Sequence, residues 1–159
     1  MPKVAGLSHI GLHAKDYPKM LDFYTRILGM RINHQSMAPP RAFLSAQPTV
    51  EDHEILLIGD RSAPPDTKLL QQISFRVAAL GDVLNFYRLF KQENVPITLT
   101  ITHGYTASIY FRDPDGNQAE VFYELPDTPH RFTAPLNFEQ DEAGLLKQLH
   151  ELIAAHGKT

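Results

Sequence analysis

Apolar and polar residues alternate in two neighbouring stretches of the chain, Thr106–Arg112 and Gln118–Glu124. The five residues between them read DPDGN, in which proline presets one turn position and glycine tolerates a positive φ. This pattern predicts a β-hairpin. With the turn centred near Asp115, Tyr110 lies directly across from Glu120 on the polar face. The opposite face is already apolar, so folding does not explain an acid and a phenol here.

Similar patterns extend over the rest of the chain. Alternating or apolar runs bounded by glycine, proline and polar residues predict strands, and apolar residues at helical spacing predict helices. The predicted strands outside the hairpin span residues 4–14, 30–37, 41–46, 54–59, 69–77 and 96–103. The predicted helices span residues 16–28, 81–93 and 141–156.

The pattern repeats itself after 63 residues. Five positions of the first half recur unchanged in the second: Leu7, Ile10, Leu21, Phe23 and Tyr24 reappear as Leu70, Ile73, Leu84, Phe86 and Tyr87. The repeat indicates a duplicated βαβββ unit. We therefore expect an α+β protein with modules at residues 4–60 and 69–125, joined by a polar linker. Residues 126–159 form a C-terminal extension with a helix, and the whole is expected to form one structural domain.

Composition narrows the class of protein. The chain has 159 residues, 43% hydrophobic and 21% charged, which is ordinary for a globular domain. Its net charge is −3 and its basic residues are not clustered, so nucleic acid is not an expected partner. It has no cysteine, which excludes disulfides and thiolate metal sites. No apolar run is long enough to span a membrane, and a cytoplasmic location is expected.

Polar residues on the first strands of the two modules suggest a metal site. His9 and Gln72 occupy equivalent positions of the repeat, on the side of each strand away from its helix. Glu120 faces the same way on the last strand. An imidazole, an amide oxygen and a carboxylate that meet in one concavity suit a hard or borderline divalent cation. Taken singly, His9 also fits a structural histidine and Gln72 a solvent-exposed residue.

Two segments resemble the vicinal oxygen chelate superfamily, which includes glyoxalase I, bleomycin-resistance proteins and extradiol dioxygenases. They are SHIGL at residues 8–12 and HGYTASIYFRDPDGNQAEVFY at residues 103–123. The second is most similar to the catechol 2,3-dioxygenase-like branch. The resemblance implies two modules that form a half-open barrel around a metal, Fe(II) in that branch. It also implies a small aromatic, catechol-type substrate cleaved with O₂, and a possible homodimer.

The resemblance also implies roles for individual residues. The metal ligands of the dioxygenase branch correspond here to His9, Gln72 and Glu120. The residues that act near substrate correspond to His103, Tyr110 and, by a looser alignment, His53. The branch has a histidine where this chain has Gln72, and that histidine completes the two-histidine, one-carboxylate site of non-haem iron.

Two alternatives therefore stay open. A glyoxalase I-like lyase or isomerase would use Zn or Ni and add Glu54 as a fourth ligand, if Glu54 faces inward. Mn is a further candidate metal for the site. A non-catalytic protein would bind a small molecule, as the drug-resistance relatives do. The histidine and tyrosine of the last hairpin favour the dioxygenase.

Overall fold

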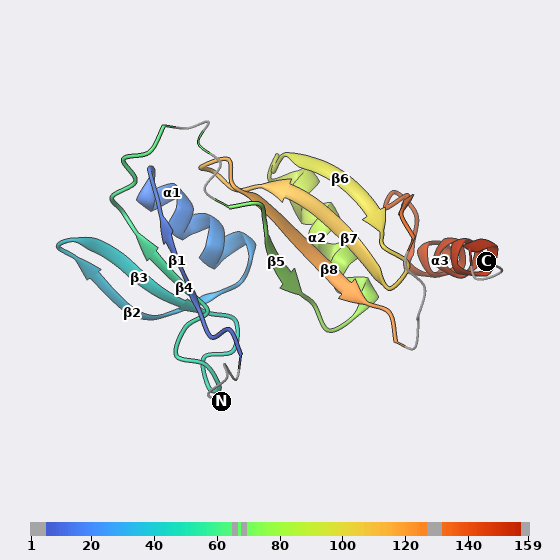
Figure 1. The fold of residues 1–159 in the computed structure, drawn as a ribbon, viewed down its shortest axis with the longest axis horizontal. Coiled ribbons are helices and arrows are strands. Elements are labelled where there is room, and N and C mark those ends of the chain that lie inside the picture. Colours follow the sequence, from blue (N-terminus) through green and yellow to red (C-terminus); the bar gives the residue numbers. More distant parts are fainter. Residues whose placement is uncertain (1–5, 65–66, 68–69, 127–131, 157–159) are drawn as a thin grey trace, which may run out of the picture. The chain divides into compact units, whose positions relative to one another are not determined.

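Two units of the chain repeat the same order of elements in a computed structural model, which describes residues 6–64, 67, 70–126 and 132–156. The units are Met1–Thr67 and Lys68–Thr159. Each contains a strand, a helix and three further strands (Figure 1). The second continues into a short strand and a C-terminal helix. The predicted α+β fold with two βαβββ modules and an extra C-terminal helix is confirmed.

The first unit is a four-stranded mixed sheet with one helical segment. Its elements are β1 (Ile10–His13), α1 (Tyr17–Asp22), η1 (Phe23–Ile27), β2 (Arg31–Met37), β3 (Pro40–Ser45) and β4 (Ile55–Ile58). The strand order is β1-β4-β3-β2, and β1 runs parallel to β4. Buried side chains of α1 and η1, such as Met20 and Tyr24, are fully enclosed in the core of this unit.

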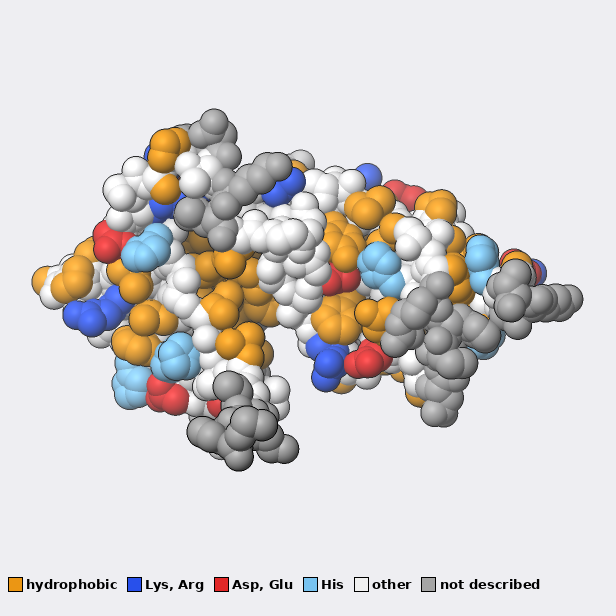
Figure 2. Space-filling model, in the orientation of Figure 1, with side chains coloured by type: hydrophobic (Ala, Val, Ile, Leu, Met, Phe, Trp, Pro, Cys, Tyr) orange, Lys and Arg blue, Asp and Glu red, His pale blue; other side chains and the backbone are white. Residues whose placement is uncertain are grey.

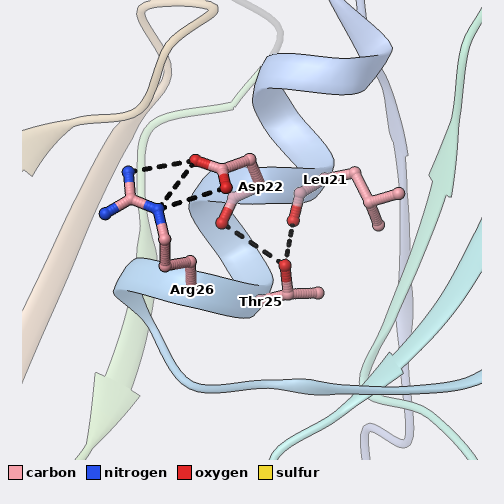
Figure 3. Close-up of polar contacts among 4 residues, drawn as sticks. All are labelled: Leu21, Asp22, Thr25 and Arg26. Atoms are coloured by element: carbon pink, nitrogen blue, oxygen red, sulfur yellow. Dashed lines mark hydrogen bonds and ion pairs between the residues drawn. The ribbon is translucent and has the colours of Figure 1, made fainter.

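The helical segment of the first unit changes character part-way, which its sequence does not predict. The hydroxyl of Thr25 donates to the carbonyl of Leu21 at 2.7 Å, four residues back (Figure 3). At this turn the α-helix passes into a π-helix, at whose end the Leu28 N–H donates to the Phe23 carbonyl five residues back at 3.1 Å. An ion pair between Arg26 and Asp22 supports the same turn. Gly29, with φ of +74°, follows the helix as predicted.

The second unit repeats the topology of the first. Its elements are β5 (Ile73–Arg76), α2 (Leu80–Gln92), β6 (Ile97–Thr102), β7 (Thr106–Arg112), β8 (Gln118–Glu124), β9 (Ala134–Pro135) and α3 (Glu142–His156). The strand order is β5-β8-β7-β6-β9, and β5 runs parallel to β8. Since β1 and β5 begin 63 residues apart and take the same place in their sheets, the repeat read from the sequence is structural.

The β7–β8 hairpin forms as its alternation predicts. Tyr110 pairs directly with Glu120 in the antiparallel register. The Asp113 carboxylate closes the turn by accepting hydrogen bonds from the backbone N–H of Asn117 at 2.8 Å and of Asp115 at 3.1 Å. Gly116 has φ of +82°, which glycine adopts without strain. The hairpin therefore fixes which side chains share each face.

The other face of the hairpin packs on α2. Phe111 is fully buried, and its ring lies 4.5 Å from that of Phe90 on α2. Ile109 and Val121 are buried on the same side. Burial of such side chains contributes about 1.5–3 kcal/mol each. This packing anchors the strands, so the residues on their polar face do not have to hold the unit together.

The C-terminal helix packs on its own unit. Leu145 and Leu149 of α3 are fully buried, and α3 lies against α2. The Tyr87 hydroxyl of α2 donates to the Glu139 carboxylate just before α3 at 2.6 Å. Among the described residues, no helix is both long and apolar enough to cross a membrane.

Some predicted bounds differ from the structure. The first strand of each module is short: β1 begins at Ile10 and β5 at Ile73, while parts of the predicted runs at residues 4–5 and 69 lie outside the described residues. The sequence patterns predict no element between the hairpin and the C-terminal helix, but Ala134 and Pro135 pair with β6 as β9. A two-residue strand has too few positions to show an alternating pattern, so the sequence gives no signal for it.

Candidate functional site

Four of the six predicted site residues line one cavity in the second unit. The cavity has a volume of about 340 Å³, within the range that small-molecule sites occupy. Its walls come from β5, from the loop before β7 and from the two strands of the hairpin. The lining residues are Gln72, Ser74, His103, Tyr105, Thr106, Tyr110, Glu120 and Phe122.

Glu120 is the buried acid of this cavity. Its side chain is only 6% exposed. One carboxylate oxygen, Oε2, accepts hydrogen bonds from the Ser74 hydroxyl at 2.6 Å and from Nε2 of Gln72 at 3.1 Å. Neither donor carries a charge, and no Lys, Arg or His of the described residues forms an ion pair with Glu120. A buried carboxylate is costly without an opposite charge, so this acid suits a bound cation.

Tyr110 and His103 form the second polar pair of the cavity. The Tyr110 hydroxyl lies 3.1 Å from Nε2 of His103. Burial raises the pKa of Tyr110, and the nearby carboxylate of Glu120 raises it further. The raised pKa favours the protonated phenol, and its hydroxyl lies within hydrogen-bond distance of Nε2 of His103. Either side chain can donate a hydrogen bond to a substrate oxygen in the cavity, and the pair can also transfer a proton to that oxygen.

The other two predicted residues, His9 and His53, lie together in the first unit. Their ring centroids are 4.3 Å apart. Nδ1–H of His53 donates to Oδ2 of Asp52 at 2.7 Å, which leaves Nε2 as the basic nitrogen of the ring. This hydrogen bond is the main reason that the pKa of Asp52 is lowered. The ring of Phe43 packs edge-on against His53 and restricts its rotation. Histidine side chains reach the surface of both units on the face drawn in Figure 2.

Glu54, the extra ligand of the glyoxalase-like alternative, has a local partner. Its Oε2 atom accepts a hydrogen bond from the backbone N–H of Ala46 at 2.9 Å. The bond joins the end of β3 to the start of β4. Glu54 therefore has a structural role in the first unit.

The donor atoms fit a divalent cation, although no ready-made cluster is present. Within the described parts of the chain, no three His, Asp or Glu side chains are placed to hold a metal ion together. The second unit offers the Glu120 carboxylate and the Gln72 amide, whose Oε1 atoms carry no hydrogen bond to a described residue. Two such oxygens suit a hard or borderline cation whose remaining ligands come from other groups, such as water or substrate.

A family comparison identifies the fold and the superfamily. The family model described as "Glyoxalase/Bleomycin resistance protein/Dioxygenase superfamily" matches residues 6–121. The chain belongs to this superfamily. The vicinal oxygen chelate resemblance seen in the sequence is thereby confirmed.

Relatives within the superfamily carry different activities in their names. The chain is 28% identical over 139 residues to biphenyl-2,3-diol 1,2-dioxygenase 3 of Rhodococcus globerulus, which covers 84% of this chain and 71% of the relative. It is similar in fold to the fosfomycin resistance protein FosX of Listeria monocytogenes, with a TM-score of 0.62, 22% identity, and coverage of 79% of this chain and 98% of FosX. It is also similar to lactoylglutathione lyase of Agrobacterium tumefaciens, with a TM-score of 0.58, 17% identity, and coverage of 77% and 96%.

Sequence reasoning missed two partners of the predicted residues. Ser74 has no predicted role, yet it contacts both Gln72 and Glu120. The signal was its position two residues after Gln72, which puts both on one side of a strand. Asp52 escaped notice because neighbouring residues in a loop need not touch, and only the fold shows that it holds His53.

Proposed function

We propose that this chain is a metal-dependent extradiol-type dioxygenase that cleaves a small aromatic diol with O₂. The observation that carries the proposal is the Tyr110–His103 hydrogen bond beside the buried carboxylate of Glu120 in one cavity. The cavity therefore contains two side chains that can transfer a proton and one buried carboxylate that a bound cation would neutralise. The 28% identity to a biphenyl-2,3-diol dioxygenase supports the same activity.

In this proposal His9, Gln72 and Glu120 hold the metal, with Fe(II) as the first candidate. When bound, the metal supplies Lewis acidity and the electron chemistry that O₂ requires. The chain supplies the remaining parts. Tyr110 orients a substrate oxygen through its hydroxyl, and His103 accepts or returns a proton through that bond.

His53 is the proposed acid–base residue of the first module. Asp52 holds its Nδ1–H, so Nε2 is the atom that exchanges a proton with the substrate. Phe43 shields one side of the ring from water. This role follows from the hydrogen bond and from the looser sequence match.

Anaerobic loading with Fe(II), followed by catechol, 3-methylcatechol and 2,3-dihydroxybiphenyl in oxygenated buffer, tests the proposal. O₂ uptake and the yellow ring-fission products are the readouts. We expect turnover with at least one diol and its loss in Glu120→Gln. The matched control is Glu124→Gln on the same strand, where the side chain is exposed and pairs with Arg76, so turnover is retained. Stoichiometric Fe(II) binding without O₂ uptake on any diol would refute the dioxygenase.

Gln72 favours a second candidate, a lyase or isomerase that uses Zn, Ni or Mn without redox chemistry. An amide oxygen is a weaker ligand than an imidazole and gives less control over iron. The candidate predicts that as-purified protein contains one of these metals in stoichiometric amount and shows no O₂ uptake. If elemental analysis instead finds iron alone, this candidate fails. If it finds no metal and the chain still binds a small aromatic, the binding-protein alternative gains support.

The remaining expectations belong to the same proposal. Residues 4–60 and 69–125 are proposed as the two modules and 126–159 as an extension. A homodimer and a cytoplasmic location are also part of the proposal. Sedimentation and cell fractionation test these two points.

A further inference from the structure

Gln72, Ser74 and Glu120, which line the cavity, form a closed ring of hydrogen bonds. The Ser74 hydroxyl donates to Oε2 of Glu120 at 2.6 Å. Nε2 of Gln72 lies 2.8 Å from the Ser74 oxygen and 3.1 Å from the same carboxylate oxygen. An ionised carboxylate can only accept, so both the hydroxyl and the amide nitrogen donate to Glu120. The Ser74 oxygen has given its one hydrogen to Glu120, and it therefore accepts from Nε2 of Gln72.

Strand geometry explains why these three residues meet. Gln72 immediately precedes β5, and Ser74 follows two residues later, which places both on one side of the chain. In the parallel pairing of β5 with β8, Ser74 stands opposite Glu120. The ring thus joins two neighbouring strands at the edge of the cavity.

The hydrogen-bonded ring of Gln72, Ser74 and Glu120 determines which side-chain oxygen atoms remain available to a ligand. Oε2 of Glu120 accepts two hydrogen bonds, whereas Oε1 accepts none from a described residue. The two hydrogen bonds of the Gln72 amide in this ring are made by Nε2, and Oε1 takes part in neither of them. An amide presents either its NH₂ group or its oxygen after a half-turn, and only the oxygen can bind a cation. A residue that holds the NH₂ group consequently keeps the oxygen available.

We propose that Ser74 is the positioning residue that makes a glutamine usable as a metal ligand at position 72. By accepting one amide hydrogen and giving its own to Glu120, it fixes both side chains with their Oε1 atoms free for one divalent cation. The inference rests on the proposed metal-dependent function. A histidine at position 72 binds through a ring nitrogen and has no amide to orient, so it would not need Ser74 in the same way.

A double-mutant cycle on metal affinity tests this coupling without any activity assay. The four full-length proteins are the native chain, Ser74→Ala, Gln72→His and the double variant. Calorimetry with Mn(II), which is stable in air, gives each dissociation constant. We expect Ser74→Ala to weaken binding about 10- to 100-fold in the native background, as removal of a ligand's orienting partner typically does. In the Gln72→His background the same change should weaken binding by a clearly smaller factor, because only the hydrogen bond to Glu120 is then lost.

Further variants and outcomes separate the possible failures. Ser74→Thr keeps the hydroxyl and should bind Mn(II) within a few-fold of the native chain. Ser74→Ala removes a donor to the buried Glu120 carboxylate and should lower the thermal midpoint slightly. A cooperative thermal transition in every variant shows that folding is intact. Equal losses in both backgrounds, or no loss in either, would overturn the role of Ser74. A native chain that binds neither Mn(II) nor Fe(II) would overturn the proposed function itself.

Discussion

Tyr110→Phe tests the catalytic role of the Tyr110 hydroxyl with little effect on packing, because the change removes one oxygen atom and keeps the aromatic ring. Tyr110 is 9% exposed, and its hydroxyl lies 3.1 Å from Nε2 of His103. His103 is half-buried and can bond to water instead, so the variant should lose about 1 kcal/mol of stability. For a chain of this size that lowers the thermal midpoint by roughly 2–4 °C. Loss of a donor that acts mainly in the transition state costs about 10²-fold in kcat.

The assay is steady-state O₂ uptake by the Fe(II)-loaded protein with its best diol. We expect kcat to fall about 10²-fold while KM stays nearly constant, which is the pattern of a group that acts in the transition state. Tyr123→Phe on β8 is the matched control, since the Tyr123 hydroxyl has no hydrogen bond to a described residue and does not line this cavity. An unchanged kcat in Tyr110→Phe would refute the reasoning. A fall of more than about 10 °C in the thermal midpoint would assign Tyr110 a structural role instead.

Two further predictions concern the scaffold of the second unit. The hydrogen bond to Glu139, followed by burial, raises the pKa of Tyr87 to about 12, from 10.0 in the unfolded chain. Below pH 10 both states keep this proton, and between pH 10 and 12 only the folded state does, so stability falls with rising pH, by about 1 kcal/mol after solvent screening. Urea unfolding gives the free energy of unfolding at pH 9 and at pH 11.5. Its decrease between these two pH values should be smaller in Tyr87→Phe than in the native chain, and an equal decrease in both proteins would contradict the prediction. Gly116→Ala should cost about 1 kcal/mol in the same assay because φ is +82° while the space around it is open, whereas Gly116→Asn should cost less; equal costs would contradict the backbone argument.

Local patterns predicted the elements well where they are long and regular. The hairpin strands have the bounds that their alternation indicates, and α2 and α3 begin and end within one residue of prediction. The Tyr110–Glu120 pairing followed from the position of the turn alone. The π-helical turn at Phe23–Ile27 was not predicted. The spacing of apolar residues indicates a helix there but does not show where its backbone bonding changes from four to five residues.

The sequence by itself determined the duplicated topology, the two faces of the hairpin and the residue types of the candidate site. These follow from periods of 2 and 3.6 residues and from turn chemistry, which act over a few neighbouring positions. Only the tertiary structure decided that Ser74 closes a hydrogen-bonded ring with Gln72 and Glu120. That ring depends on the register between β5 and β8, strands that lie more than 40 residues apart in the chain. Contacts between side chains so far apart in sequence are set by tertiary packing and by strand pairing, and local sequence patterns do not predict them.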